Sequence, residues 1–183
     1  MSAAKNVRVW DLPVRLMHWT IVCAVALTLL SGHGIISTAW HNPLGYLVLA
    51  IVSARIAWGF LGSRHARFRN FVATPAAAVA YAGTVVRHVD PRYIGHNPLG
   101  ATMMIALLAC LAGLCFSGWL YTTDAFWGEA WLDRSHAYLA WTLLALVVLH
   151  VAGVIFTGIR HRENLVLSMW NGNKRAPTGS DIE

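Results

Sequence analysis

The sequence predicts an all-α integral membrane protein, folded as a four-helix bundle whose helices run up, down, up and down. Hydrophobic residues make up 57% of the 183 residues, charged residues make up 12%, and the mean hydropathy is +0.53. This composition is too apolar for a water-soluble domain of this length. Four segments reach the roughly 20 apolar residues that a helix needs to cross a hydrocarbon core of about 30 Å. We place the spans at about residues 14–35, 42–62, 98–121 and 136–159.

The first two spans contain charged side chains, whereas the last two are nearly uninterrupted. Residues 98–120 contain no ionisable side chain except two cysteines, and residues 137–159 contain only His150. Span two contains one charged residue, Arg55, and span one contains Arg15 together with two histidines. An ionisable side chain inside a membrane span is costly and usually functional, so these residues are candidates for a site.

The rest of the chain is short links, one longer insert and a tail. We expect residues 1–175 to form a single transmembrane domain and residues 176–183 to form a polar, disordered tail. Within the insert between spans two and three, the Ala-rich residues 75–89 predict a helix that lies on the membrane surface. Pro98 is expected to lie in the first turn of span three.

The lysine and arginine residues predict the orientation in the membrane. The outer side would have an uncharged turn near residues 36–40 and a loop with three acidic residues and one arginine. By the positive-inside rule, both termini are therefore cytoplasmic. The net charge of +6 follows from this topology, and we expect no nucleic-acid partner. Twelve of the fourteen basic residues fall on the cytoplasmic side: Lys5, Arg8, Arg15, Arg64, Arg67, Arg69, Arg87, Arg92, Arg160, Arg162, Lys174 and Arg175.

The nine histidines include two that lie fourteen residues apart in span four, His136 and His150. Fourteen helical steps of about 100° return to within roughly 40° of the same face, and the rise of ~1.5 Å per residue separates the two imidazoles by about 21 Å. Because the spans alternate in direction, His41 should lie level with His136 near the outer face, and His18 level with His150 near the cytoplasmic face. The sequence therefore predicts two histidine pairs.

Paired imidazoles from facing helices are the axial ligands that six-coordinate haem iron takes. Zinc fits less well, because a closed zinc site uses four ligands and usually includes sulfur or carboxylate. We expect haem at both pairs, with His33 as the alternative to His41 for the outer ligand. The other possibility for each histidine is a hydrogen-bonding contact between helices. Arg55 follows His41 by fourteen residues, so we expect it at the inner depth, where it binds a haem propionate or reaches the interface.

With these residues in place, the chain resembles the bacterial cytochrome b561 family, including its relatives that serve as the b-type subunit of nickel-iron hydrogenases. The resemblance covers about residues 7–170. Its motifs are individually short, and their order along the spans makes them specific. They are Val9-Trp10-Asp11-Leu12-Pro13-Val14-Arg15 before His18-Trp19; His41 with Leu44-Gly45-Tyr46 and Arg55; Gly95-His96-Asn97-Pro98-Leu99-Gly100; and His136 with His150.

The resemblance implies a cytochrome of the bacterial inner membrane with two haem b groups, whose axial ligands come from spans one, two and four. It also implies respiratory electron transfer between a quinone and a redox partner protein, such as a periplasmic c-type cytochrome or an oxidoreductase subunit. One branch of the family oxidises superoxide and reduces ubiquinone. Three acidic residues in the outer loop, against a single Arg134, would attract an anion poorly and favour a cationic partner.

Three questions stay open on the sequence alone. No general base or nucleophile is evident, so the chain is either an electron carrier or the membrane subunit of an oxidoreductase, with no catalytic residue of its own. A non-redox transporter or channel subunit would also use membrane histidines, but it would typically show a repeated half-structure or a broken helix. His96 precedes span three, where it either contacts a quinone or anchors the helix start.

Overall fold

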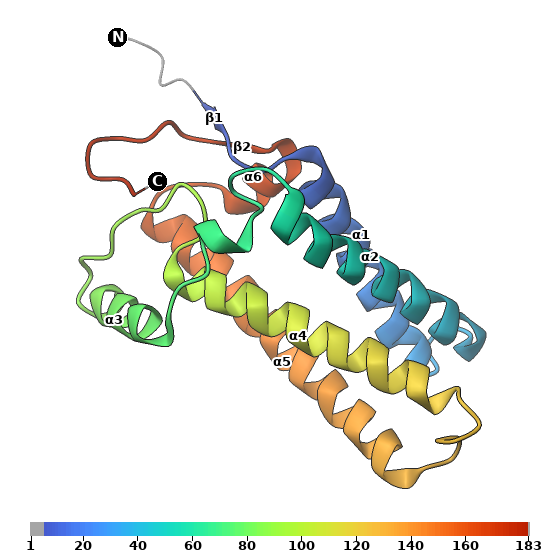
Figure 1. Ribbon diagram of the computed structural model, residues 1–183. Helices are drawn as coiled ribbons and strands as arrows, with labels where there is room; N and C mark the ends of the chain where they lie inside the picture. Colours follow the sequence, from blue (N-terminus) through green and yellow to red (C-terminus); the bar gives the residue numbers. More distant parts are fainter. Residues whose placement is uncertain (1–5, 183) are drawn as a thin grey trace. The chain divides into compact units, whose positions relative to one another are not determined.

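The computed structural model describes residues 6–182 and is mostly helical, with coil connections between the helices (Figure 1). Helices α1, α2, α4 and α5 are long and apolar enough to cross a membrane. This confirms the predicted all-α membrane fold. In chain order the elements are β1 (Val7–Arg8), α1 (Leu12–Gly32), the 3-10 helix η1 (Thr38–Trp40), α2 (His41–Leu61), the 3-10 helix η2 (Phe68–Asn70), α3 (Pro75–Val86), α4 (Pro98–Tyr121), α5 (Ala130–Arg160), α6 (Leu165–Asn171) and β2 (Asn173–Lys174).

Helix α5 begins six residues before the predicted span four, and this is the largest difference in the four long helices. The preceding loop ends in a turn in which the carbonyl of Glu129 accepts hydrogen bonds from the amides of Leu132 and Asp133. The helix therefore starts in a polar stretch that hydropathy assigns to the loop. Its first turn contains Asp133, and a carboxylate there is favourable next to the positive end of the helix dipole.

The starts of α3 and α4 follow the sequence signals. The side chain of Thr74 accepts a hydrogen bond from the Ala77 amide, and Pro75 occupies the first turn of α3. At α4, the amide of Gly100 donates to the side chain of Asn97 at 2.7 Å. Asn97 directly precedes Pro98, the first residue of the helix. Both helices thus combine a side-chain N-cap with a proline in the first turn, which is where proline's missing N–H is tolerated.

The chain divides into two compact units, and each of the four long helices contributes to both. Unit 1 comprises Met1–Arg15, Ala57–Ile105 and Val148–Glu183, and unit 2 comprises Leu16–Ile56 and Ala106–Val147. The predicted histidines fall in both units: His18, His41 and His136 in unit 2, and His150 in unit 1.

Unit 2 is a bundle of four helical segments whose core contains residues from every helix. Figure 1 shows successive helices running in opposite directions. The buried side chains come from α1, α2, α4 and α5, whereas large apolar side chains on the same helices remain exposed, such as Phe116, which is 58% exposed. An apolar outer surface is what a helix presents to lipid. The core residues are Ala24, Val48, Val52, Cys110, Leu111 and Leu143.

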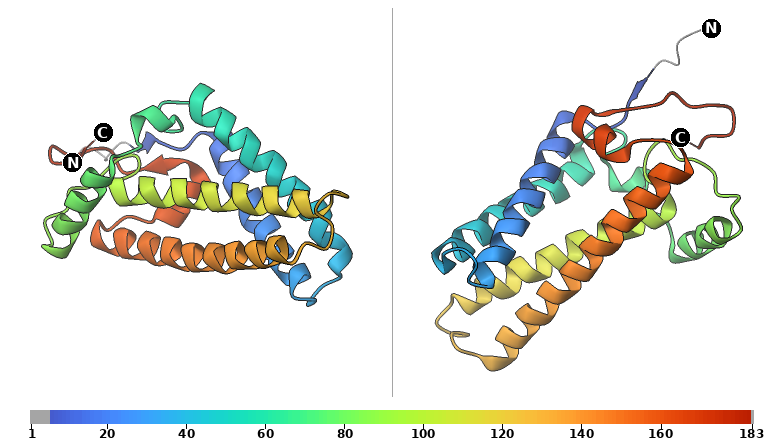
Figure 2. Two further views of the ribbon diagram at one scale, coloured as in Figure 1. Left: turned by 60° about the horizontal axis from the view of Figure 1, so that its bottom comes forward. Right: turned by 180° about the vertical axis from the view of Figure 1, so that it is seen from behind.

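Unit 1 contains the ends of the long helices and the polar connections between them. The antiparallel pair β1–β2 aligns Val7 with Lys174 and Arg8 with Asn173. Helix α3 is a separate short helix beside the start of α4, as the views in Figures 1 and 2 agree. A small apolar cluster of Val9, Trp10 and Ile94 is buried among these segments.

The expectation of a disordered tail is wrong for residues 176–182. The guanidinium of Arg92 donates at 2.6 Å to Asp181, and also at 2.6 Å to Glu163. Ile182 extends this attachment, because its amide donates to the Arg92 carbonyl at 2.8 Å and its own carbonyl accepts from Ile94 at 2.9 Å. The polar composition of the tail suggested disorder, but its acidic residue meets a buried arginine 89 positions earlier.

Candidate functional site

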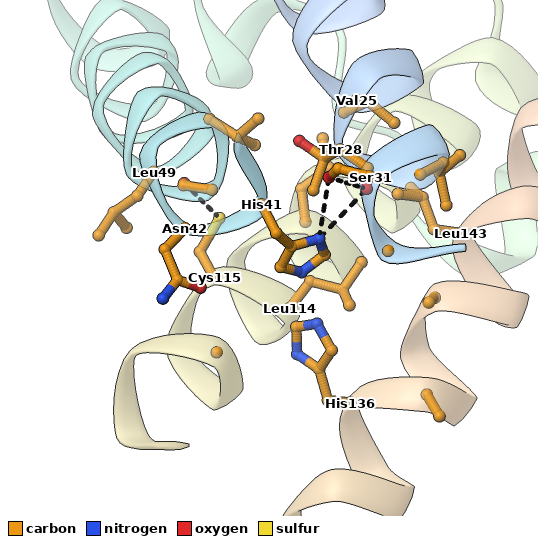
Figure 3. A pocket seen from close by; sticks show the side chains of 18 of the residues that line it. Val25, Thr28, Ser31, His41, Asn42, Leu49, Leu114, Cys115, His136 and Leu143 are labelled. Carbon is orange, nitrogen blue, oxygen red and sulfur yellow. Dashed lines mark hydrogen bonds between the residues drawn. The ribbon is translucent and has the colours of Figure 1, made fainter. Parts of the chain in front are cut away.

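Two of the predicted histidines face each other at one end of unit 2, the end that the sequence predicts to face outward. The ring centroids of His41 and His136 are 6.2 Å apart, and the two ring planes make an angle of 69°. His41 is the first residue of α2, and His136 lies in the second turn of α5. Figure 3 shows the two rings next to each other, with neither side chain fully buried.

A cavity of about 480 Å³ surrounds the two rings and takes its walls from all four long helices. Most of its lining is apolar, including Val25 from α1, Leu49 from α2, Leu114 from α4 and Leu144 from α5. Small-molecule and cofactor sites typically measure about 300–1,000 Å³ and combine apolar walls with a few polar groups. The cavity at His41 and His136 has both properties.

The ring of His41 is held by the end of helix α1. Its Nδ1 atom lies 3.2 Å from the carbonyl oxygen of Thr28 and 3.3 Å from Oγ of Ser31 (Figure 3). The Ser31 hydroxyl donates to the same Thr28 carbonyl at 2.9 Å. The 3-10 turn η1 leads directly into His41, so the short connection after α1 brings this ring back onto the helix end.

The ring of His136 is held in a similar way by the end of α4. Its Nδ1 atom lies 2.9 Å from Oγ of Ser117, and the Ser117 hydroxyl donates to the Leu114 carbonyl at 3.1 Å. Ser117 is buried, with 6% of its surface exposed. In both cases the proposed ligand is oriented through Nδ1, and the other ring nitrogen takes no part in these bonds.

Each serine precedes a glycine that packs closely on the same imidazole. A Cβ atom at Gly32 would lie 3.2 Å from Cε1 of His41, and a Cβ atom at Gly118 would lie 3.2 Å from Cε1 of His136. Carbon atoms in contact normally lie about 3.5–4.0 Å apart, so a side chain at either position would press on the ring. Glycine is thus the residue that leaves each imidazole its space.

The donor set and its spacing fit haem iron. Two metal–nitrogen bonds of about 2.0 Å, together with roughly 1.1 Å from each nitrogen to its ring centroid, give a centroid separation of about 6.2 Å. The observed separation is 6.2 Å. Among residues 6–182, no group of three or more His, Cys, Asp or Glu side chains is placed to hold a metal ion. The arrangement is therefore two facing imidazoles, with no further protein ligand among the described residues.

His33, the predicted alternative to His41, also lines the cavity but packs against a different ring. Its centroid lies 6.1 Å from that of Trp141, and its side chain is exposed. The structure thus places His41 opposite His136 and places His33 against a tryptophan. This geometry favours His41 as the outer ligand.

The residues predicted for the inner site lie in the predicted spans. His18 and Arg55 belong to unit 2, and His150 belongs to unit 1. His18 is half-buried in α1 with its ring 5.0 Å from that of Trp19, and His150 is half-buried in α5. Arg55 is buried within α2 with 7% of its surface exposed. The assignment of these three residues to a second haem stays a prediction.

His96 lies in an aromatic cluster in unit 1. Its ring centroid is 4.8 Å from that of Trp10 and 4.6 Å from that of Phe71. The N-cap of α4 is provided by the neighbouring Asn97, not by His96. These contacts support the anchoring interpretation of His96 over the quinone interpretation.

The histidine pattern did not predict the residues that orient the two facing imidazoles: Thr28, Ser31, Gly32, Ser117 and Gly118. Serine and glycine are common in membrane helices, so neither residue alone gives a signal. A signal was nevertheless present, because a Ser-Gly dipeptide occurs at the outer end of span one and again at the outer end of span three.

Known protein families and curated proteins include relatives of this chain. The profile of the prokaryotic cytochrome b561 family matches residues 9–172. Curated relatives named "Probable Ni/Fe-hydrogenase B-type cytochrome subunit" include those of Bradyrhizobium diazoefficiens, 22% identical, and Rhodobacter capsulatus, 24% identical. The alignments cover 93% and 92% of this chain and 86% and 81% of those proteins, respectively. The protein of Cupriavidus necator carries the same name and is 25% identical over 93% of this chain and 88% of its own.

No solved structure matches the chain. The family match, by contrast, extends over nearly the whole described chain and includes all four membrane-capable helices and both facing histidines. The chain therefore belongs to the prokaryotic cytochrome b561 family, and it is an integral membrane b-type cytochrome that binds haem b and acts in electron transfer.

Proposed function

We propose that the protein carries electrons through the bacterial inner membrane between the quinone pool and a redox partner protein, using two haem b groups. The observation that carries this proposal is the pair of imidazoles, His41 and His136, facing each other across a cofactor-sized cavity. Haem iron at such a pair would supply reversible one-electron chemistry. The protein contributes the two ligands, an apolar environment and the hydrogen bonds that orient each ring.

The second haem is proposed at His18 and His150. Support comes from the sequence spacing, since His150 follows His136 by fourteen residues within one continuous helix, α5. Arg55 has the same spacing from His41 within α2. A guanidinium is costly inside a span, and a haem propionate would bind it through two parallel hydrogen bonds.

The orientation proposed has both termini in the cytoplasm. Eleven of the twelve basic residues used for this prediction lie in the described chain, whereas Lys5 lies outside it. Helix α3 supports the same orientation, because Val79 and Val86 are 73% and 78% exposed and the flanking Arg69 and Arg87 are also exposed. An apolar helix face flanked by arginines suits a position in the headgroup region of an anionic cytoplasmic leaflet.

The partner is proposed to dock at the outer face. The names of the relatives make a hydrogenase subunit one candidate, and a periplasmic c-type cytochrome is another. Asp124, Glu129 and Asp133 are exposed at this end and favour a cationic surface on the partner. Acidic residues at the docking face would speed association mainly at low ionic strength.

The haem content of the purified protein tests this proposal. We expect two haems per chain by the pyridine haemochrome assay, and quinol should reduce both. His136→Ala or His41→Ala should remove one haem, and His150→Ala or His18→Ala should remove the other. His33→Ala is the matched control and should retain both haems. Colourless protein after haem supply, or full haem content in His136→Ala, would contradict the proposal.

The partner is tested separately. Quinol-reduced protein in liposomes should be oxidised by a cationic c-type cytochrome faster than by an anionic one, and neutralising the outer acids should remove the difference. Superoxide supplied at the outer face is the competing donor. If superoxide reduces the haems while both cytochromes are inert, the proposed direction and partner are wrong.

A further inference from the structure

The same four-residue arrangement holds each of the two facing imidazoles. At the ends of α1 and α4, a Ser-Gly dipeptide packs on a histidine from the following long helix, α2 or α5. In each case the serine hydroxyl bonds to the carbonyl three residues earlier and also to Nδ1 of the histidine. The pattern appears twice at one cavity, from two sequence segments that are otherwise different.

The direction of the hydrogen bonds at His41 can be derived from the donors and acceptors present. A backbone carbonyl can only accept, so the contact between His41 Nδ1 and the Thr28 oxygen requires a proton on Nδ1. Ser31 has one hydroxyl proton and gives it to the same carbonyl, so its oxygen faces His41 as an acceptor. Nδ1 is therefore protonated, and Nε2 has a free lone pair.

The same reasoning applies to His136. The hydroxyl proton of Ser117 goes to the Leu114 carbonyl, which leaves the serine oxygen to accept from Nδ1 of His136. Both rings are thus fixed in the tautomer whose Nε2 atom is available to a metal. A ligating histidine typically donates its other N–H to an acceptor of this kind, which fixes the ring and makes the ligand nitrogen more basic.

We propose that Ser31-Gly32 and Ser117-Gly118 are paired imidazole cradles that fix the tautomer of the outer haem's ligands and lower its midpoint potential. This rests on the proposed function, in which His41 and His136 are those ligands. A more basic nitrogen stabilises ferric iron relative to ferrous iron, so each hydrogen bond lowers the potential. Serine supplies the acceptor, and glycine supplies the space for the ring.

The two cradles differ in strength. Each imidazole also contacts a backbone carbonyl that no serine substitution removes, that of Thr28 at His41 and that of Leu114 at His136. The serine contact is shorter at His136, where Oγ of Ser117 lies 2.9 Å from Nδ1, than at His41, where Oγ of Ser31 lies 3.3 Å from Nδ1. Removing the hydroxyl at position 117 should therefore affect the outer haem more than removing it at position 31.

The test is a redox titration of the haem-loaded protein with single substitutions. In Ser117→Ala we expect both haems to remain. The midpoint potential of the outer haem should rise by at least about 59 mV, which is a tenfold change in the equilibrium constant of a one-electron couple. Ser31→Ala should shift the same haem in the same direction by less, and the double variant should shift it most. The inner haem serves as the internal reference, and Ser53→Ala, at an exposed serine of α2, is the matched control.

Ser117→Thr keeps the hydroxyl and should return the potential toward that of the unmodified protein. If Ser117→Ala fails to hold haem, Ser117→Cys replaces it, since a thiol has nearly the size of the hydroxyl but is a weak acceptor. Full haem content with an outer potential equal to that of Ser53→Ala, in either variant, would overturn the cradle. Retention of both haems by His136→Ala would instead refute the proposed ligands, so the two failures are distinguishable.

Discussion

Gly118→Ala provides a measurement of how tightly the outer imidazole is packed. The new Cβ atom would lie 3.2 Å from Cε1 and 3.7 Å from Nδ1 of His136. The shorter distance is a few tenths of an ångström below the ordinary contact of about 3.5–4.0 Å between carbon atoms. The ring cannot move freely, because its Nδ1 is hydrogen-bonded to Ser117 at 2.9 Å. The substitution should therefore push the imidazole out of its position opposite His41.

The expected magnitude follows from a comparison with Gly113→Ala on the same helix. A Cβ atom at Gly113 would lie 3.4 Å from the flexible end of Leu139, which is an ordinary contact. Both substitutions gain up to about 1 kcal/mol of helix propensity, so this contribution cancels in the comparison. Overpacking at position 118 costs about 1–3 kcal/mol, which corresponds to a roughly 5- to 150-fold weaker haem affinity than in Gly113→Ala.

The assay is transfer of haem from the purified protein to an excess of apo-myoglobin, followed by absorbance. The outer haem of Gly118→Ala should leave faster than that of Gly113→Ala, and the inner haem should leave at the same rate in both. Circular dichroism confirms that the helices remain. Equal rates of outer-haem loss in the two variants would refute the inference that Gly118 makes room for the His136 ring.

Three further predictions concern unit 1. Asp11→Ala should lower the stability of the protein in detergent by about 1–3 kcal/mol. The Asp11 carboxylate accepts one hydrogen bond from the first turn of α1 and another from an indole N–H, and the substitution removes both. Thermal unfolding measures the change, and an unchanged unfolding temperature would contradict it. Acid should release the tail: burial alone would raise the pKa of Asp181, but its hydrogen bonds from Thr178 and Arg92 outweigh this and lower it, so its ion pair with Arg92 is intact above about pH 3.9 and is lost as pH falls through the lowered value. A spin label at Ser180 should gain mobility in that range, whereas an Asp181→Asn variant should show the mobile spectrum already at pH 7. An environment-sensitive fluorophore at Val79 should be shielded from an aqueous quencher in anionic liposomes without any partner protein; quenching equal to that of a label at Ser180 would contradict the surface-helix proposal.

Hydropathy predicted the four long helices because each is a continuous apolar run, and lipid leaves a spanning backbone few alternatives to a helix. It could not predict the start of α5, where the chain is polar but still helical. The charge pattern placed twelve basic residues on the cytoplasmic side and gave no sign that any of them is buried. Arg92 and Lys174 are in fact 5% and 6% exposed, and they pair with acidic side chains distant in sequence. Such pairings depend on tertiary structure, so composition does not reveal them.

At the outer site, the alternation of helix direction predicted that His41 faces His136, with His33 as the alternative, and the structure places His41 there. The alternation was not sufficient to predict what holds the two rings. The orientation of an imidazole depends on which atoms lie beside Nδ1, and here they are a hydroxyl and a carbonyl at the end of a neighbouring helix. Periodicity identifies a face of a helix but carries no information about the direction of a hydrogen bond.

The position of the site at the helix ends has a physical reason. Within lipid, a histidine N–H must find its acceptor inside the protein, and most backbone carbonyls of a helix are already bonded within that helix. Ser31 and Ser117 lie near the last residues of α1 and α4, and each bonds to a carbonyl of its own helix, that of Thr28 or that of Leu114. A serine that bonds back to the carbonyl three residues earlier presents its oxygen sideways as an additional acceptor. Helices that end beside the cavity can therefore orient imidazoles from their neighbours without placing a charged group in the membrane.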